Sequence, residues 1–333
     1  MKIMVAQCTA AALPGGDYYR AALCAALEAE GHKVQQLDLP SIASPGRALN
    51  NLASLRLLGT ELTADALICL DPVAAVLQHS CKIVILLDDS YLASDRVALR
   101  CEQPADRHYI ANVLQSALGE ADHIFTLSHF ASQSLRALSI QPAVLIQPTI
   151  EIAPCAYVRH KGPELLALGR LDERQRPELL ITCLARLPEP LRARWIAPEA
   201  STTRVADLYQ LARELGVEQR FAIDVRRVNA GEKAYLLAHA AALIDIAPGA
   251  LAVGETAMQA VRTGVPVITC IDGGASVELV GAESPDPANV DAAAVVAAIR
   301  TAWDASSIQA NIRLRPDGTS GTGWAPLLKA VAR

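Results

Sequence analysis

Short apolar runs alternate with amphipathic stretches along the whole chain. The first half has strand-like runs at 2–8, 33–39, 65–70, 82–87 and 123–128, and helical patterns at 17–31, 104–121 and 130–138. After Pro148 the alternation resumes, with strands expected at 164–169, 192–197, 220–225, 242–247 and 266–271 and helices at 177–187, 204–215, 230–241, 254–263 and 290–304. Strands that alternate with helices predict parallel sheets covered on both faces. Two such series therefore predict two doubly wound α/β domains.

The segment 148–163 separates the two series. It contains three prolines and little periodicity, which is typical of a linker. We therefore expect domains at 1–150 and 160–333, a division that suits a chain of 333 residues. The last helix of the chain either stays with the second domain or packs back on the first domain, and the sequence leaves both alternatives open. The segment 44–59 carries Arg47 and Arg56 among apolar residues at helical spacing, and a helix packed on its own domain is favoured over one on a lipid surface.

Composition narrows the class of protein. Hydrophobic residues make up 52% of the chain and charged residues 20%, with a net charge of −5. These values exclude a disordered chain and give no general attraction to nucleic acid. The eight cysteines form no CxxC pair, so we expect no metal site and buried thiols in a reducing compartment. With no signal-peptide pattern and no uncharged apolar run of 18 residues, the sequence predicts a cytoplasmic protein.

Four stretches together resemble one known family. They are 13–34, a glycine-containing turn, helix and strand; 121–138, a strand followed by a helix; 167–188, around Gly169-Arg170; and 263–280, around Thr263-Gly264-Val265-Pro266-Val267. In this order they are similar to the retaining glycosyltransferases of family 4. The resemblance implies the GT-B fold, in which two Rossmann-like domains face each other across a cleft. It also implies an acceptor-side first domain, a second domain that binds a nucleoside-diphosphate-sugar as substrate, and no metal or other cofactor.

Two candidate sites lie in the first half. Gly15 and Gly16 join a strand to a helix, which suits either an ordinary tight turn or a backbone that approaches phosphate; the resemblance favours the second. Asp88 follows the run at 82–87, where the family often has histidine near the reacting sugar. A carboxylate there is equally suited to act as a base, to orient a hydroxyl or to cap a turn.

Two cations follow the strand at 164–169. The family has arginine at the position of Arg170 and a lysine five or six residues later, and both hold the donor diphosphate. Here those later positions are Gln175 and Arg176. Guanidinium groups suit the charge of a leaving diphosphate, so the resemblance implies this role for Arg170. For Arg176, a donor contact and a solvated loop charge are equally favoured.

The segment before Thr263 departs from the family. The family has two glutamates with seven residues between them, and Leu251 and Gln259 occupy their positions. The resemblance implies that the backbone of Ala252, Val253 and Gly254 binds phosphate and sugar, and that Gln259 accepts one hydrogen bond from the ribose. Glu255 is a first-turn helix acid more readily than a ribose ligand. Gly273 and Gly274 match a glycine pair that lies near the donor.

These observations predict a metal-independent glycosyltransferase that moves a sugar, with retention, to a hydroxyl of a glycan, lipid-linked sugar or protein. The alternative is a catalytically degenerate protein that stabilises a partner glycosyltransferase, because Asp88, Gln175, Leu251 and Gln259 all replace family residues. A sugar-nucleotide epimerase or hydrolase has no positive support from the residues. A peripheral position at the inner face of a membrane is compatible with a lipid-linked acceptor. No nucleic-acid partner is expected.

Overall fold

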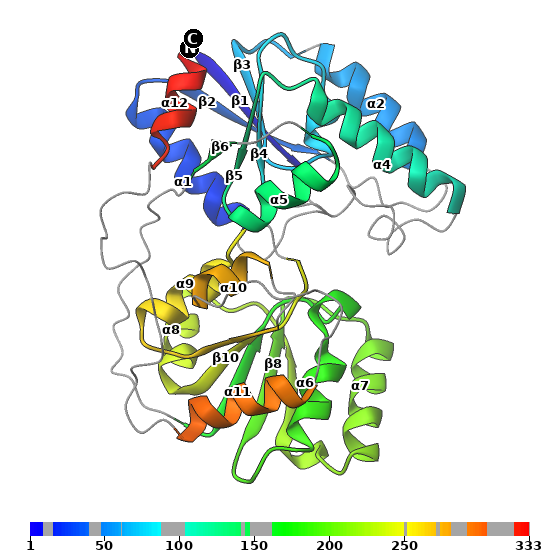
Figure 1. Cartoon of the computed structure of the whole chain (residues 1–333), viewed down its shortest axis with the longest axis vertical. Helices are drawn as coiled ribbons and strands as arrows, with labels where there is room; N and C mark the ends of the chain where they lie inside the picture. The colour runs from blue at the N-terminus through cyan, green and yellow to red at the C-terminus, as the bar shows by residue number, and fades with distance from the viewer. Residues whose placement is uncertain are drawn as a thin grey trace. The chain divides into compact units, whose positions relative to one another are not determined.

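The computed structural model forms two compact α/β units. Unit 1 comprises Met1–Ile150 and Asp317–Arg333, and unit 2 comprises Glu151–Pro316 (Figure 1). The structure describes residues 1–8, 16–39, 48–60, 62–87, 104–140, 144–146, 162–249, 252–270, 274–280, 292–304 and 323–332. Almost all of the expected linker, 148–161, lies outside these residues.

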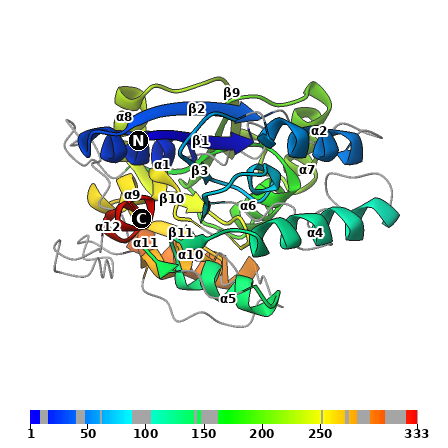
Figure 2. The same ribbon diagram turned by 90° about the horizontal axis from the view of Figure 1, so that it is seen from above.

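Unit 1 contains a sheet of six parallel strands in the order β2-β1-β3-β4-β5-β6. The strands are β1 (Lys2–Cys8), β2 (Lys33–Leu39), β3 (Ala66–Cys69), β4 (Lys82–Leu86), β5 (His123–Thr126) and β6 (Val144–Leu145). The helices are α1 (Gly16–Ala29), α2 (Ala48–Thr60), α4 (Pro104–Gly119), α5 (His129–Ala137) and α12 (Ala325–Val331), with a short 3-10 turn η1 (Ala74–Val76). Every residue of β3 and β4 is buried, because helices and connections cover both faces. β2 lies at the edge beside β1, which Figure 2 shows from above.

Unit 2 contains a sheet of five parallel strands in the order β11-β10-β7-β8-β9. The strands are β7 (Glu164–Leu168), β8 (Arg192–Ala197), β9 (Phe221–Val225), β10 (Ala240–Asp245) and β11 (Val267–Thr269). The helices are α6 (Pro177–Leu184), α7 (Thr202–Glu214), α8 (Ala230–His239), α9 (Glu255–Arg262), α10 (Ala275–Val280) and α11 (Ala292–Asp304), with 3-10 turns η2 (Glu173–Gln175) and η3 (Glu218–Arg220).

The two faces of the unit 2 sheet pack against different helices. Side chains alternate along each strand, so Trp195 packs with α6, α7 and α11 while its neighbour Ile196 packs with α8 and α9. The indole of Trp195 is buried, and its Nε1 donates a hydrogen bond of 3.1 Å to the carbonyl of Gly169. This contact ties the core to the point where β7 ends and the following loop begins.

The C-terminal helix α12 belongs to unit 1. Its residues Leu327 and Val331 are buried. The second unit therefore ends at Pro316, before the end of the domain expected at 160–333.

The elements predicted from the periodicity are confirmed within a few residues at each end. The strand expected at 123–128 ends at Thr126, because the hydroxyl of Ser128 accepts a hydrogen bond from the Ala131 amide and so begins α5. The two-residue strand β6 is too short to have a periodicity, and the sequence did not predict it. Within the described residues, no helix combines the length and apolar character needed to cross a membrane.

Candidate functional site

The loop that follows β7 is held in one conformation by hydrogen bonds. The Gly169 amide donates to Ile196 O at 3.1 Å, and Arg204 Nε donates to Leu171 O at 2.8 Å. Asp172 caps the turn η2, since its Oδ1 accepts from the Gln175 amide at 3.1 Å. We name Gly169–Arg176 the Arg170 loop. It begins at the carboxyl end of a strand near the centre of the sheet, the edge at which open α/β sheets bind ligands.

Arg170 has unused hydrogen-bonding capacity in a confined position. Its side chain is 20% exposed, and Nε lies 2.9 Å from Asp172 Oδ2 in an ion pair without hydrogen-bond geometry. Nη2 is buried and has no hydrogen-bond partner among the described residues. Buried donors in folded proteins are nearly always paired, so the missing acceptor is expected to come from a ligand or from water. A guanidinium at this position is suited to an anion.

Arg176 closes the loop with an unusual backbone. Its φ of 55° and ψ of 48° place it in the left-handed region, which costs free energy for a residue with a Cβ atom. Pro177 follows as the first residue of α6, and the Arg176 amide donates to Glu173 O at 3.1 Å. The side chain is half-buried. Gln175, at the other family cation position, lies beside Gly169, where an added Cβ atom would be 3.4 Å from Gln175 Oε1.

A second loop approaches the Arg170 loop from the adjacent strand β10. Arg174 Nη2 lies 3.5 Å from the carbonyl of Gly249 and donates to it. Further along, Val253 packs against the apolar cluster under α8 and α9, and Gly254 is the N-cap of α9 without a side-chain hydrogen bond. The N-terminus of α9 carries partial positive charge, and no capping side chain competes for its amides.

Gln259 on α9 also has a buried polar atom without a partner among the described residues. The residue is 4% exposed, and its Oε1 accepts no hydrogen bond from the described residues. An amide oxygen buried in this state loses the free energy of its hydration unless a donor reaches it. Among the described residues, unit 2 therefore has an orphan donor on Arg170 after β7 and an orphan acceptor on Gln259 of α9; Arg194 Nε and Arg204 Nη2 are also buried without a hydrogen-bond partner there.

Glu255 is occupied by a contact that the sequence did not predict. Lys233 Nζ on α8 donates to Glu255 Oε1 at 2.7 Å, and both side chains are mostly buried. The ion pair joins two helices on one face of the sheet. Residues 22 apart in the sequence give no periodic signal for such a contact.

Of the remaining site residues predicted from the sequence, the structure describes some and not others. Asp88, Gly15, Leu251 and Gly273 lie outside the described residues. Gly16 is the first residue of α1. Gly274, with φ of +64°, immediately precedes α10, and its conformation is one that glycine adopts without strain.

Two aspartates with organising contacts escaped the sequence analysis. In unit 1, Asp71 is buried, and its two oxygens accept from the amides of Cys8 at 2.7 Å and Ala74 at 2.9 Å. In unit 2, Asp245 ends β10 and accepts a hydrogen bond from Ser276 Oγ at 2.8 Å. A single acidic residue at the end of an apolar run was the available signal in both cases.

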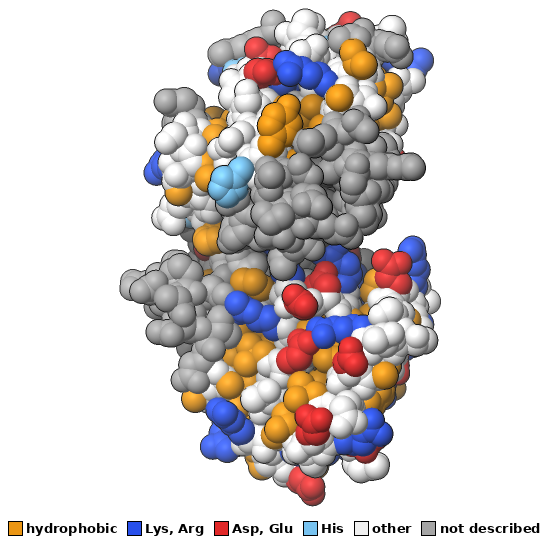
Figure 3. Space-filling model, turned by 90° about the vertical axis from the view of Figure 1, so that its right-hand side faces the viewer, with side chains coloured by type: hydrophobic (Ala, Val, Ile, Leu, Met, Phe, Trp, Pro, Cys, Tyr) orange, Lys and Arg blue, Asp and Glu red, His pale blue; other side chains and the backbone are white. Residues whose placement is uncertain are grey.

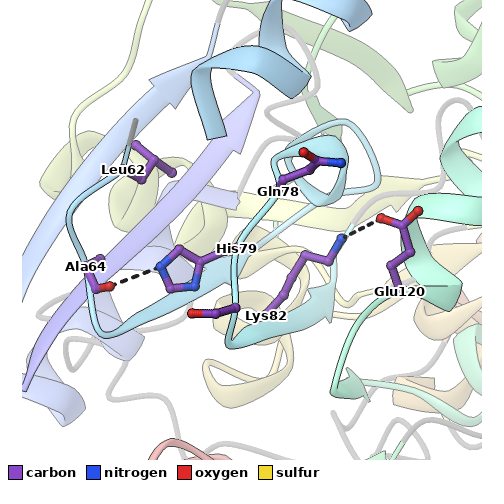
Figure 4. Close-up of a pocket in the computed structure, with 7 residues that line it drawn as sticks. Leu62, Ala64, Gln78, His79, Lys82 and Glu120 are labelled. Carbon is purple, nitrogen blue, oxygen red and sulfur yellow. Dashed lines mark hydrogen bonds and ion pairs between the residues drawn. The ribbon is translucent and has the colours of Figure 1, made fainter. Parts of the chain in front are cut away.

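Unit 1 contains a polar pocket at the opposite edge of its sheet, where β3 and β4 begin (Figure 4). We name it the Lys82 pocket; its volume is about 540 Å³. It is lined by Leu62, Ala64, Gln78, His79, Ser80, Lys82 and Glu120. Lys82 is buried, and its Nζ donates to Ala75 O at 2.9 Å and lies 3.6 Å from Glu120 Oε2. His79 contacts Ala64 O through Nε2 and Cys81 through Nδ1. These polar groups are paired with the chain itself.

Metal ligands do not gather in the described part of the chain. No group of three His, Cys, Asp or Glu side chains there is placed to hold an ion. On the face of unit 2 drawn in Figure 3, acidic and basic side chains are interspersed.

Comparison with known proteins gives similarity at the level of structure. No protein-family model and no curated protein sequence matches the chain. Solved structures match over almost the whole length. WaaG, a glycosyltransferase involved in lipopolysaccharide biosynthesis, matches with a TM-score of 0.69 at 17% identity, covering 98% of each chain. The sucrose-phosphate synthase of Thermosynechococcus elongatus matches with a TM-score of 0.67 at 15% identity, covering 99% of this chain and 97% of that one.

The chain has the GT-B fold. HepE of Anabaena, solved in complex with UDP-glucose, matches with a TM-score of 0.67 at 15% identity and covers 100% of this chain and 98% of its own. The expectation of two Rossmann-like domains of GT-B type is confirmed. At these identities the similarity establishes the fold, and function must be argued from the site.

Proposed function

We propose that this protein is a metal-independent glycosyltransferase that moves a sugar, with retention, from a nucleoside-diphosphate-sugar to a hydroxyl acceptor. The observation that carries the proposal is Nη2 of Arg170, which is buried at the carboxyl edge of the unit 2 sheet and has no hydrogen-bond partner among the described residues. A guanidinium that still has a donor to offer at this edge is suited to the negative charge of a diphosphate. The complex of a protein of the same fold with UDP-glucose supports a nucleotide-sugar as the donor.

In the proposed mechanism, unit 2 binds the donor and stabilises the leaving group. Arg170 and Arg176 face the diphosphate, whose negative charge grows as the bond to the sugar breaks. The backbone amides of Ala252, Val253 and Gly254 and the N-terminus of α9 bind phosphate oxygens, together with Gly273 and Gly274 on the next loop. A charge that increases in the transition state gains more from these donors than the ground state does, which lowers the barrier.

Gln259 is proposed to accept a hydrogen bond from a ribose hydroxyl. Its orphan Oε1 supplies the acceptor, and a hydroxyl supplies the donor. A neutral amide forms a weaker bond to a hydroxyl than the carboxylate found in the family, so a lower nucleotide affinity follows. Glu255 has no part in this proposal, because Lys233 neutralises it.

Unit 1 is proposed to bind the acceptor. Gly15 and Gly16 place backbone near the donor phosphate, and Asp88 orients or deprotonates the acceptor hydroxyl. The acceptor is a hydroxyl of a glycan, a lipid-linked sugar or a protein.

The second candidate is a catalytically degenerate GT-B protein that stabilises another glycosyltransferase. The ion pair between Glu255 and Lys233 favours it, because it occupies the acid nearest to the missing family glutamates. Clear turnover by the isolated chain excludes this candidate, whereas co-purification with a transferase and no nucleotide binding supports it.

A nucleotide panel tests the first proposal. UDP, GDP and ADP, and sugars carried on each, are added to the full-length protein in EDTA, and thermal stability and sugar release are measured. One nucleotide at 100 times its Kd is expected to stabilise the protein by about 2.7 kcal/mol. The Arg213→Ala variant, which removes an exposed guanidinium on α7, is the matched control and should respond as the wild type does. No stabilisation and no sugar release with any donor would refute the proposal.

A further inference from the structure

A carboxyl group interrupts the apolar layer beneath α8 and α9. Along β10, Ile244 and the following Ile246 pack on the opposite face, so Asp245 shares its face with Leu243. Leu243 belongs to the cluster that contains side chains of α8 and α9. The apolar alternation of a buried strand would place another aliphatic residue at position 245.

The neighbouring strands show which residues stand at the same level of the sheet as Asp245. Asp245 pairs with Thr269 of β11, and Leu243 pairs with Leu166 of β7. Two residues beyond Leu166 is Leu168, which pairs with Ile196 of β8. Leu168 and Ile196 both pack in the apolar cluster. In this row Leu168 and Ile196 are apolar, whereas Asp245, Thr269 of β11 and Asp224 of β9 are polar. Asp245 therefore places a carboxyl beside the apolar part of the row, at the last level of the sheet before the loops.

The Asp245 carboxyl accepts a hydrogen bond from another element of unit 2. Ser276 is 1% exposed, stands in the first turn of α10 and donates from Oγ to Asp245 Oδ2 at 2.8 Å. Burial raises the pKa of the Asp245 carboxyl, and the bond from Ser276 opposes that rise. Gly274, with its left-handed backbone, lies two residues before Ser276. The bond thus joins the end of β10 to the turn that follows β11.

Fold stability gives little reason for this pair. A polar pair of one buried and one partly buried side chain gains little net free energy, and apolar side chains of similar size at both positions are often equally stabilising or better. Such a pair instead fixes the relative position of two elements, because a hydrogen bond holds its two atoms at a defined distance and angle. Local departures from the apolar pattern are commonly found where function requires them.

We propose that Asp245 and Ser276 are positioning residues for the donor site. Their bond holds the start of α10, and the glycine turn before it, against the carboxyl end of β10. The Arg170 loop and the turn at 252–254 leave the same edge of the same sheet, from β7 and β10. The assignment to the donor rests on the proposed function, but the positioning itself does not.

Three variants separate positioning from simple stability. Asp245→Asn keeps an acceptor for Ser276, Ser276→Ala removes the donor, and the double variant Asp245→Leu with Ser276→Ala makes the layer apolar. Leu208→Ala, a cavity on the opposite face of the sheet, is the control for general destabilisation. Each is measured for melting temperature, for Kd of the nucleoside diphosphate that best stabilises the wild type, and for KM and kcat with the corresponding sugar donor.

The double variant is expected to melt at or above the wild-type temperature and to bind the nucleotide about tenfold more weakly, with KM rising more than kcat falls. A lost orienting hydrogen bond of ordinary strength corresponds to a change of this size. Asp245→Asn should stay within about threefold of the wild type, since its Oδ1 still accepts from Ser276. Wild-type affinity in the double variant overturns the inference, as does an equal loss of affinity in Leu208→Ala.

If the wild type binds none of the nucleotides, the proposed function is refuted but the positioning role is not. Hydrogen exchange then tests the positioning role directly. The amides of 274–280 are then compared between the wild type and the double variant. Faster exchange in this segment, with unchanged exchange in α7, supports the positioning role. Unchanged exchange in 274–280 refutes it.

Discussion

Two polar regions of this protein differ in how their buried groups are satisfied. In the Lys82 pocket of unit 1, the Lys82 ammonium and both ring nitrogens of His79 have partners in the chain. At the carboxyl edge of the unit 2 sheet, Arg170 Nη2 and Gln259 Oε1 are buried and lack partners among the described residues. For the paired groups, hydrogen bonds within the fold offset the free-energy cost of desolvation. For the orphan groups, that cost is offset only when a ligand binds.

The difference explains why the Lys82 pocket, despite its volume of about 540 Å³, is the weaker candidate for a binding site. The Lys82 pocket has volume and charge, but a ligand there has to displace internal bonds. Gln78 is paired as well. With its amide oxygen turned toward Arg56, it accepts hydrogen bonds from Arg56 Nε at 2.9 Å and from Arg56 Nη2 at 3.1 Å. In unit 2, Arg170 Nη2 and Gln259 Oε1 can bind a ligand without breaking a hydrogen bond to the described residues. The following predictions test this contrast, beginning with the largest effect.

Arg170→Ala should remove the orphan donor and lower kcat/KM for sugar transfer about 100-fold, which corresponds to about 2.7 kcal/mol. The melting temperature should change little, because Nη2 makes no hydrogen bond to the described residues and the ion pair of Nε with Asp172 is partly exposed. Steady-state kinetics and thermal melting check both parts. A full loss of stability with unchanged kinetics in the remaining folded protein would place Arg170 among the paired, structural groups.

Lys82→Ala should have the opposite profile. It leaves Ala75 O without its donor and removes the packing of a buried aliphatic stem, so we expect a loss of about 2 kcal/mol in the free energy of unfolding. Nucleotide affinity should be unchanged. Denaturant unfolding and nucleotide titration measure the two effects. The control is Arg56→Ala in the same cluster, whose exposed ion pair with Glu120 should contribute less than about 1 kcal/mol. A lost nucleotide affinity in Lys82→Ala would break the contrast.

Asp245 should make stability fall as the pH rises. Burial raises the pKa of its carboxyl in the folded protein above the unfolded value of 3.8, so the folded state binds more protons within that window. Each pH unit between the unfolded and folded pKa values therefore costs at most about 1.4 kcal/mol for this single group. Unfolding measured against pH should show a smaller decline above pH 4 in Asp245→Asn, which cannot ionise. Parallel curves would contradict the raised pKa.

Arg176→Gly should separate backbone strain from side-chain function. Glycine adopts the left-handed conformation of Arg176 without steric cost, a gain offset in part by chain entropy, so we expect a stabilisation of up to about 1 kcal/mol. If the guanidinium contacts the diphosphate, kcat/KM falls at the same time. Higher stability with unchanged kinetics would remove Arg176 from the donor site and leave Arg170 as the principal cation.

Gln259 should give the smallest effect. Gln259→Leu replaces an orphan acceptor with an apolar side chain, so stability is retained or increased while the Kd for nucleotide rises about three- to tenfold. Gln259→Glu supplies a carboxylate acceptor and should lower the Kd, because charge-assisted hydrogen bonds are stronger. Equal affinities in all three proteins would show that the ribose does not reach α9.

The sequence predicted the sheets better than the site. Buried parallel strands such as 66–69 and 82–86 are continuous apolar runs, and the glycine or capping residue beside a helix marks its ends. Arg170 was identified because it follows a strand directly and matches an arginine of the family that the sequence resembles. The ion pair of Glu255 with Lys233 and the bond of Asp245 with Ser276 join residues 22 and 31 positions apart, and no local pattern encodes such contacts.

The order of apolar and polar residues by itself determined two doubly wound α/β units and placed the candidate residues at strand ends and helix starts, because periodicity and capping are local properties. The tertiary structure decided which polar groups are paired. In the sequence, Gln259 is a neutral residue at a position where the family has glutamate; in the fold, its Oε1 is buried without a partner among the described residues. Glu255 is a candidate ribose ligand in the sequence, whereas in the fold it forms an ion pair with Lys233. Pairing depends on distance and on exclusion of water, and both arise only when separate elements pack together.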